Sequence, residues 1–134
     1  MTTQELLQLQ DLRQEVASLE ERLAELREHP PQITTKGDGM PKAKGNISDP
    51  VGGYTATVVA LEALLESQKE KCIQAEYRAT QFILSIPDSL TRQIFTMRYM
   101  QGMTWGQTAR NLSGRHSADA VRMAAKRFLR STQI

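Results

Sequence analysis

Apolar residues recur at alternating intervals of three and four along two long stretches of the sequence. The first series consists of Leu9, Leu12, Val16, Leu19, Leu23 and Leu26. The second consists of Tyr54, Val58, Leu61, Leu65, Gln68, Cys72, Ala75, Ala79, Phe82 and Ile86. This spacing places side chains on one face of a helix and is typical of a coiled-coil seam. The pattern predicts a helix over residues 3–28, ended by a Pro-Pro pair, and a second helix over residues 51–85.

The two seams can pack on each other or pair with another chain. In an in-register parallel homodimer through the first helix, Glu15 would face the partner subunit's Glu20, and Arg22 the partner subunit's Arg27. Like-charged pairs of this kind cost about half a kcal/mol each. The charges therefore favour an antiparallel hairpin within the chain. Dimerisation through the surplus length of the second helix is the alternative.

The segment between the helices, residues 29–50, is rich in Pro, Gly and Lys and poor in apolar residues. This composition predicts a long loop. Lys36, Lys42 and Lys44 could contact phosphates or a partner protein, although a flexible connector is the simpler interpretation.

After Ile86 the sequence predicts three short helices. Pro87 breaks the long helix, Asp88 or Ser89 can cap the next one, and Gly102 ends it. The apolar face expected for that helix is Leu90, Ile94 and Met97. Thr104 can cap a helix over 105–112, with its inner face at Trp105, Thr108, Ala109 and Leu112. Ser117 can cap the last helix, whose buried stripe is expected at Val121, Ala124, Ala125, Phe128 and Leu129.

These elements predict an all-α fold with no strands. A long antiparallel helical hairpin, coiled-coil-like, over residues 1–86 is followed by a three-helix helix-turn-helix domain over residues 87–134. The abundance of Leu, Ala, Glu and Gln and the scarcity of Val and Ile agree with this class.

Composition narrows the cellular compartments in which the protein is expected. No run approaches the roughly 18 apolar residues of a membrane span, and the N-terminal residues are polar and heptad-like, unlike a signal peptide. Cys72 is the only cysteine, so no internal disulfide can form. A cytoplasmic protein is expected.

Charge is unevenly distributed along the chain. From Ile86 onward there are eight Lys or Arg and two Asp, a net charge of +6, whereas residues 1–85 carry a net charge of −4. Such a split is typical of a polyanion-binding end joined to an acidic scaffold.

No set of residues typical of an enzyme active site is apparent. His29 and His116 lie in predicted loops and do not pair with acids or with Cys72 at the spacing of a metal site or of a nucleophile and its base. The glycines do not lie between a predicted strand and a helix, as they do in a phosphate-binding loop. We expect no catalysis, no cofactor and no metal.

The basic C-terminal helices are arranged like a helix-turn-helix. The outer face near the start of the last helix is where base edges would be read, by Ser117, Ala118, Asp119, Arg122, Met123 and Lys126. The turn and the rim would hold phosphates through Arg110, Arg115, His116, Arg127 and Arg130. Arg122 is the best candidate for bidentate reading of a guanine. Asp119 could accept a hydrogen bond from cytosine, or could only favour the helix dipole.

The stretch IPDSLTRQIFTMRYMQGMTWGQTARNL resembles the fourth region of sigma-70-type factors. The shared features are a proline-led helix that ends in Met97-Arg98-Tyr99, followed by Gly102, Trp105 and Ala109 with Leu112. The whole chain is similar to small phage and prophage proteins with an N-terminal coiled coil, a loop like GDGMPKAKG and a sigma-like C-terminal domain. The resemblance implies a sequence-specific transcriptional regulator of the phage or prophage type, associated with the nucleoid of a bacterial host cell.

Two departures from sigma factors narrow this expectation. No segment resembles the region that melts promoters, so the protein should not open DNA alone. Twelve positions separate Ala109 from Val121, about two more than usual, so the turn should be longer and more basic. Double-stranded DNA is the expected partner. The alternatives are an adaptor that binds RNA polymerase or another protein, and a phage DNA-packaging or structural protein.

Overall fold

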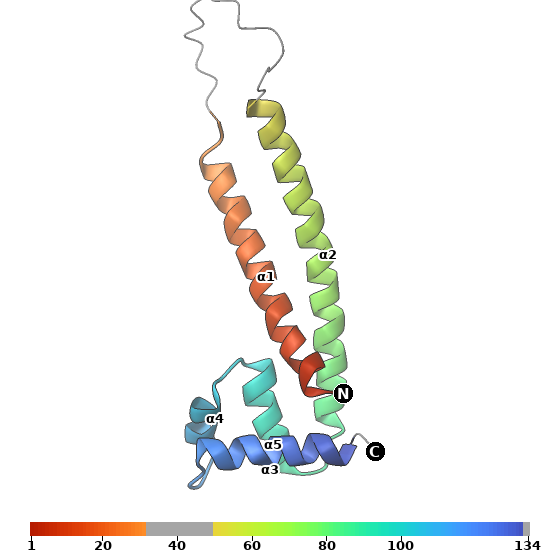
Figure 1. Cartoon of the computed structure of the whole chain (residues 1–134), viewed down its shortest axis with the longest axis vertical. Helices are drawn as coiled ribbons and strands as arrows, with labels where there is room; N and C mark the ends of the chain where they lie inside the picture. Colours follow the sequence, from red (N-terminus) through yellow and green to blue (C-terminus); the bar gives the residue numbers. More distant parts are fainter. Residues whose placement is uncertain (32–49, 133–134) are drawn as a thin grey trace, which may run out of the picture. The chain divides into compact units, whose positions relative to one another are not determined.

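The computed structural model describes residues 1–31 and 50–132, and all regular elements in those ranges are helical. Figure 1 shows them in chain order. They are α1 (Thr3–Glu28), α2 (Pro50–Leu84), α3 (Ser89–Phe95), the π-helical turn η1 (Thr96–Met100), α4 (Trp105–Asn111) and α5 (Ala118–Thr132). The all-α prediction is therefore confirmed. Most of the expected loop, including Lys36, Lys42 and Lys44, lies outside the described residues.

The chain divides into two compact units, and α1 and α2 contribute to both. One unit is Met1–Gln14 with Lys69–Ile134, and the other is Glu15–Gln68. The C-terminal helices are thus grouped with one end of the hairpin, while the predicted boundary at residue 86 stays a prediction. None of the helices in the described ranges is long and apolar enough to cross a membrane.

In the unit Glu15–Gln68, α1 and α2 run antiparallel and meet along the two predicted seams (Figure 1). Leu23 is buried, and the other seam positions are at least partly shielded. Polar side chains bridge the two helices beside the seam. The Tyr54 hydroxyl donates to the Leu26 carbonyl at 2.9 Å, and Arg27 pairs with Glu62 at 2.6 Å.

In the other unit, the first turns of α1 pack against the last turns of α2. Leu6 and Leu9 are fully buried, and Arg13 pairs with Glu76 at 2.9 Å. Two α1 side chains also reach the backbone of η1. Gln10 donates to the Arg98 carbonyl at 2.7 Å, and Arg13 donates to the Met100 carbonyl. The N-terminal helix is therefore part of the core against which the C-terminal helices pack.

An aromatic cluster joins the helices of this unit. Phe82 of α2, Phe95 of α3 and Phe128 of α5 have ring centroids 5.6–6.0 Å apart. Tyr99 adjoins Phe95 at 5.4 Å, and Trp105 adjoins Tyr99 at 6.2 Å with nearly perpendicular rings. Aromatic pairs at these separations add about 0.5–1.5 kcal/mol each beyond area burial. Burial also raises the pKa of Tyr99.

The helix after Pro87 differs from its prediction in its buried face. Asp88 caps α3 through the Thr91 N–H at 3.0 Å, as expected. Leu90, however, is exposed, and the buried residues are Ile94, Phe95 and Tyr99. The helix then widens into η1, where the Gln101 N–H donates to the Thr96 carbonyl, an i to i+5 bond of 3.0 Å.

Candidate nucleic-acid interface

The supporting helix of the candidate site, α4, begins at a capping box. The Thr104 hydroxyl accepts from the Gln107 N–H at 3.1 Å, and the Gln107 side chain accepts from the Thr104 N–H at 3.0 Å. Behind it, Thr108, Ala109 and Leu112 are buried. This short helix is therefore fixed at its start and along its inner face.

The turn between α4 and α5 spans the six residues 112–117. Leu112 is extended, and Gly114 has a φ of +96°, a conformation that favours glycine. The His116 ring lies 3.1 Å from the Ser113 carbonyl through Nε2. Ser117 then caps α5, because its hydroxyl accepts from the Ala120 N–H at 3.0 Å. The predicted cap is thus confirmed.

The buried stripe of α5 follows the predicted pattern. Val121, Ala125 and Leu129 are buried, while Ala124 and Phe128 are partly shielded. Contacts with α4 and α3 account for this burial. The opposite side of α5 is left to solvent, and most of the basic residues lie there.

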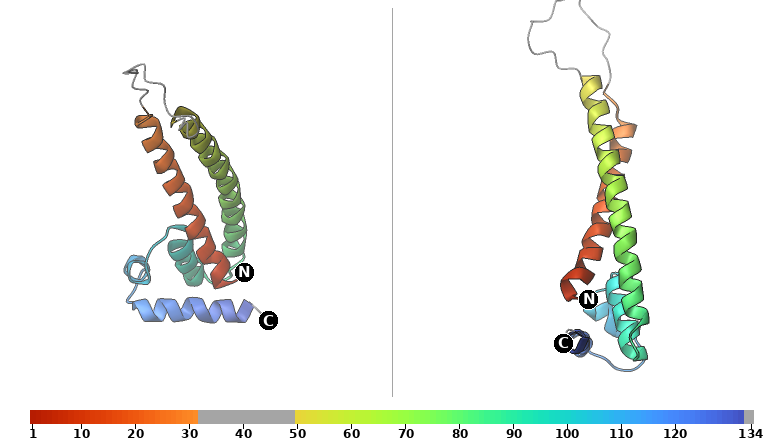
Figure 2. Two further views of the ribbon diagram at one scale, coloured as in Figure 1. Left: turned by 45° about the horizontal axis from the view of Figure 1, so that its top comes forward. Right: turned by 90° about the vertical axis from the view of Figure 1, so that its right-hand side faces the viewer.

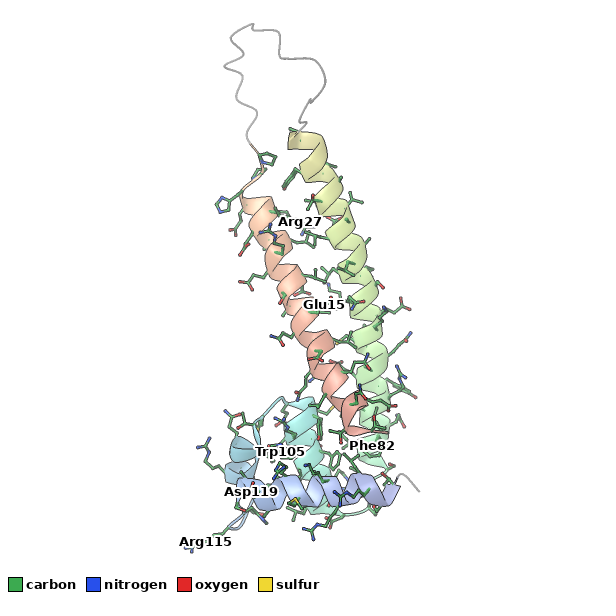
Figure 3. The ribbon with its side chains drawn as sticks, in the orientation of Figure 1. Glu15, Arg27, Phe82, Trp105, Arg115 and Asp119 are labelled. Atoms are coloured by element: carbon green, nitrogen blue, oxygen red, sulfur yellow. The ribbon has the colours of Figure 1, made fainter. Side chains whose placement is uncertain are left out.

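The structure brings the predicted binding residues together on the end of α4, the turn and α5. Arg122 and His116 are partly shielded, and the others are exposed: Ser117, Ala118, Asp119, Met123, Lys126, Arg110, Arg115, Arg127 and Arg130. Figure 3 shows Arg115 extending from the turn, away from the helices, and Asp119 near the start of α5. Exposure does not separate the residues expected to read bases from those expected to bind phosphates.

Arg122 lies at the border of the buried stripe rather than at the centre of the exposed face. Its guanidinium is 3.6 Å from the Asp119 carboxylate, one turn earlier, and the two side chains are 40% and 87% exposed. An exposed pair of this kind contributes little to stability. Asp119 therefore partly offsets the charge of Arg122 and adds little to the stability of α5.

Two of the eight basic residues in the C-terminal third serve the fold. Arg92 donates from Nε and Nη2 to the Ile86 carbonyl, at 3.1 and 2.9 Å, and so satisfies the backbone after α2. Arg98 donates to the Met103 carbonyl at 2.9 Å, and its guanidinium lies 4.8 Å from the Trp105 ring centroid. The sequence carries no local signal for these roles. The remaining six cations are Arg110, Arg115, Arg122, Lys126, Arg127 and Arg130.

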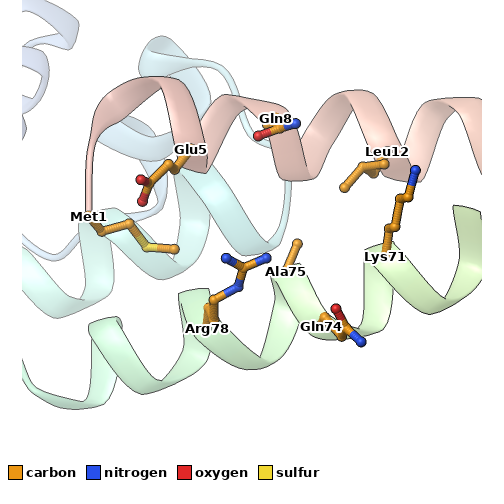
Figure 4. Close-up of a pocket in the computed structure, with 8 residues that line it drawn as sticks. All are labelled: Met1, Glu5, Gln8, Leu12, Lys71, Gln74, Ala75 and Arg78. Atoms are coloured by element: carbon orange, nitrogen blue, oxygen red, sulfur yellow. The ribbon is translucent and has the colours of Figure 1, made fainter.

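A groove between α1 and α2 lies outside this surface (Figure 4). Its volume is about 160 Å³, and it is lined by Met1, Glu5, Gln8, Leu12, Lys71, Gln74, Ala75 and Arg78. The lining contains no Ser, Cys or His side chain that a neighbouring base could activate as a nucleophile. Within residues 1–31 and 50–132, no three His, Cys, Asp or Glu side chains are grouped to hold a metal ion.

The candidate site is thus a basic surface built on a helix, a turn and a second helix. No protein-family model, curated protein or solved structure matches the chain.

Proposed function

We propose that the protein is a sequence-specific DNA-binding transcriptional regulator that docks α5 in the major groove of duplex DNA. The observation that carries this proposal is the set of six cations on the end of α4, the turn and the outer side of α5. In the part of the chain that the structure describes, Arg122 alone among them is in an ion pair. Unneutralised cations on one surface favour a polyanion.

The shape of the surface fits a groove. The major groove, about 12 Å wide, admits one α-helix. α5 has 15 residues and is shielded on one side by α3 and α4, so its other side is free to enter. Arg110 at the end of α4 and Arg115 in the turn lie before its N-terminus in the chain, where helix-turn-helix proteins contact the backbone.

The aromatic residues support binding to closed duplex. Five of the seven, including Trp105, form the cluster that joins the helices, so they are unavailable to stack on flipped bases. Tyr54 is engaged with the α1 backbone, and Tyr77, although 66% exposed, lies on α2 and not on the basic surface. We therefore propose that the protein reads paired bases and does not melt promoters.

The test is to select bound sequences from random duplex DNA and to compare variants on selected and random duplexes over a range of salt. Arg115→Ala, which removes a predicted phosphate contact in the turn, should weaken binding to both duplexes and reduce the salt slope by about 1. Arg122→Ala should mainly reduce discrimination, by about 1–3 kcal/mol if the arginine reads a guanine. Arg78→Ala, which removes an equal charge from an exposed site on α2, is the matched control and should bind normally.

Two results would contradict the proposal. No retention of duplex at low salt would remove DNA binding altogether. Equal weakening of selected and random duplex by Arg122→Ala, with no selected consensus sequence, would leave only non-specific binding.

A second candidate is an adaptor that binds RNA polymerase or another protein, for which a groove along α3 and η1 offers a surface. Its volume is about 170 Å³, and it is lined by Ser89, Arg92, Gln93, Thr96, Met97 and Gln101. None of the six cations lines it. This alternative predicts co-purification with polymerase that survives nuclease treatment and is lost in Met97→Glu.

A further inference from the structure

Part of α2 carries exposed apolar side chains on a second face. Ile73, Tyr77 and Leu84 each remain 66% exposed. All three lie in the unit that contains the C-terminal helices. Figure 2 (right) shows α2 at the front of the view with no other helix drawn over it. Large apolar side chains aligned in this way are typical of an interaction surface.

The spacing of these residues is that of a helix–helix seam. With Thr80, which is also exposed, they are separated by 4, 3 and 4 positions. The seam that faces α1 uses other residues, among them Cys72, Ala75 and Ala79, so the two seams do not compete. We name the outer series, Ile73, Tyr77, Thr80 and Leu84, the α2 outer stripe.

We propose that the α2 outer stripe binds a second copy of this chain, with the two α2 helices antiparallel. When one stripe is laid on another in that direction, Ile73 lies opposite Leu84 of the partner subunit. Tyr77 then lies opposite Thr80 of the partner subunit. Two-fold symmetry repeats both pairs, so each of the two bulky rings meets one small side chain. The stripe is complementary to itself.

The charges next to the stripe favour the antiparallel direction. Glu70 and Glu66 continue the same helical face towards the N-terminus of α2. In a parallel in-register pair, each would face the same residue of the partner, which is unfavourable. An antiparallel overlap limited to residues 73–84 leaves both glutamates outside the contact. Gln74 and Gln81 flank it, and their amides can hydrogen-bond to one another across the symmetry axis.

The first experiment is the mass of the full chain in solution without DNA, measured by light scattering over a range of concentrations. We expect a mass twice 15.1 kDa at high concentration. Tyr77→Glu should give the monomer, with helix content unchanged because the residue is exposed. Val59→Glu is the matched control. It is exposed on the same face of α2 but outside the overlap, so it should leave the dimer intact.

The second experiment fixes the direction by disulfide formation in a Cys72→Ala background. An Ile73→Cys chain mixed with a Leu84→Cys chain should cross-link, whereas neither should cross-link to itself. Cross-linking of each chain only to itself would show a parallel pair and overturn the proposal. A wild-type monomer at all concentrations, or a Tyr77→Glu dimer, would also overturn it. None of these readouts depends on DNA binding.

Discussion

At the scale of single residues, arginine serves two purposes in the C-terminal third. Arg92 and Arg98 give their donors to backbone carbonyls and, for Arg98, its planar face to Trp105. Arg115 and Arg130 stay exposed, in the turn and on α5. The guanidinium groups therefore satisfy and position the backbone at one place and present positive charge to solvent at another. The net charge of the C-terminal third therefore overstates the number of cations that are available to a ligand.

Asp119 is the one acidic residue on the proposed DNA surface of α5, and its removal should change affinity. In Asp119→Asn, a charge that repels phosphate disappears and Arg122 loses its partner. Affinity for duplex of any sequence should rise, while stability falls by about 0.3–1 kcal/mol from the lost helix-dipole interaction. Fluorescence anisotropy and thermal unfolding measure the two effects.

Glu21→Gln, an equal charge change at an exposed site on α1, should leave DNA affinity unchanged. If Asp119→Asn weakens binding to the selected sequence alone, the carboxylate reads a base instead.

At the scale of elements, the α4–α5 turn is defined by backbone conformation as much as by side chains. Gly114 has a φ of +96°, and a Cβ there would lie 3.4 Å from the His116 ring. That distance is an ordinary van der Waals contact, so the positive φ is the reason that the turn needs glycine here. Its six residues set how α5 follows α4.

Gly114→Ala should lower the free energy of unfolding by about 1–2 kcal/mol, the cost of a left-handed conformation with a Cβ. Urea denaturation measures it. Gly106→Ala is the control, because Gly106 lies inside α4 and a Cβ would meet nothing closer than 3.9 Å. That variant should be neutral or stabilising by up to about 1 kcal/mol. Equal effects of the two variants would contradict the role of the positive φ.

Sequence patterns predict the elements well and their tertiary roles less well. Both seams, the Thr104 and Ser117 caps and the α5 stripe depend on local spacing, so they could be predicted. The exposed Leu90, the structural use of Arg92 and Arg98, and the widening into η1 depend on what packs against each residue. The same holds for the division of the chain, which follows contacts between residues far apart in sequence.

At the scale of the whole molecule, the C-terminal helices share their core with both ends of the chain's first 86 residues. Phe82 supplies one ring of the aromatic cluster, and α1 supplies buried Leu6 and Leu9. Gln10 and Arg13 satisfy carbonyls of η1. A fragment that begins at Pro87 would lose all of these contacts.

We therefore expect residues 87–134 alone to lack a cooperative thermal transition, in contrast to the full chain. Circular dichroism with heating measures it. Phe82→Ala in the full chain should keep the fold but lower the free energy of unfolding by about 3 kcal/mol, since part of the cluster is lost. Cooperative melting of the fragment near the temperature of the full chain would show instead an independent domain.

The π-helical turn η1 has a consequence for how the chain tolerates changes of length. It holds one residue more than an α-helical turn, and that extra residue sets the angular position of everything after it. Deletion of one residue between Thr96 and Met100 would remove that surplus and leave an ordinary α-helical turn, so the side chains that follow would keep about the same direction. Insertion of one more residue would instead turn them by about 100° about the helix axis, because the wide turn already holds its extra residue. This segment should therefore tolerate the loss of a residue better than the gain of one.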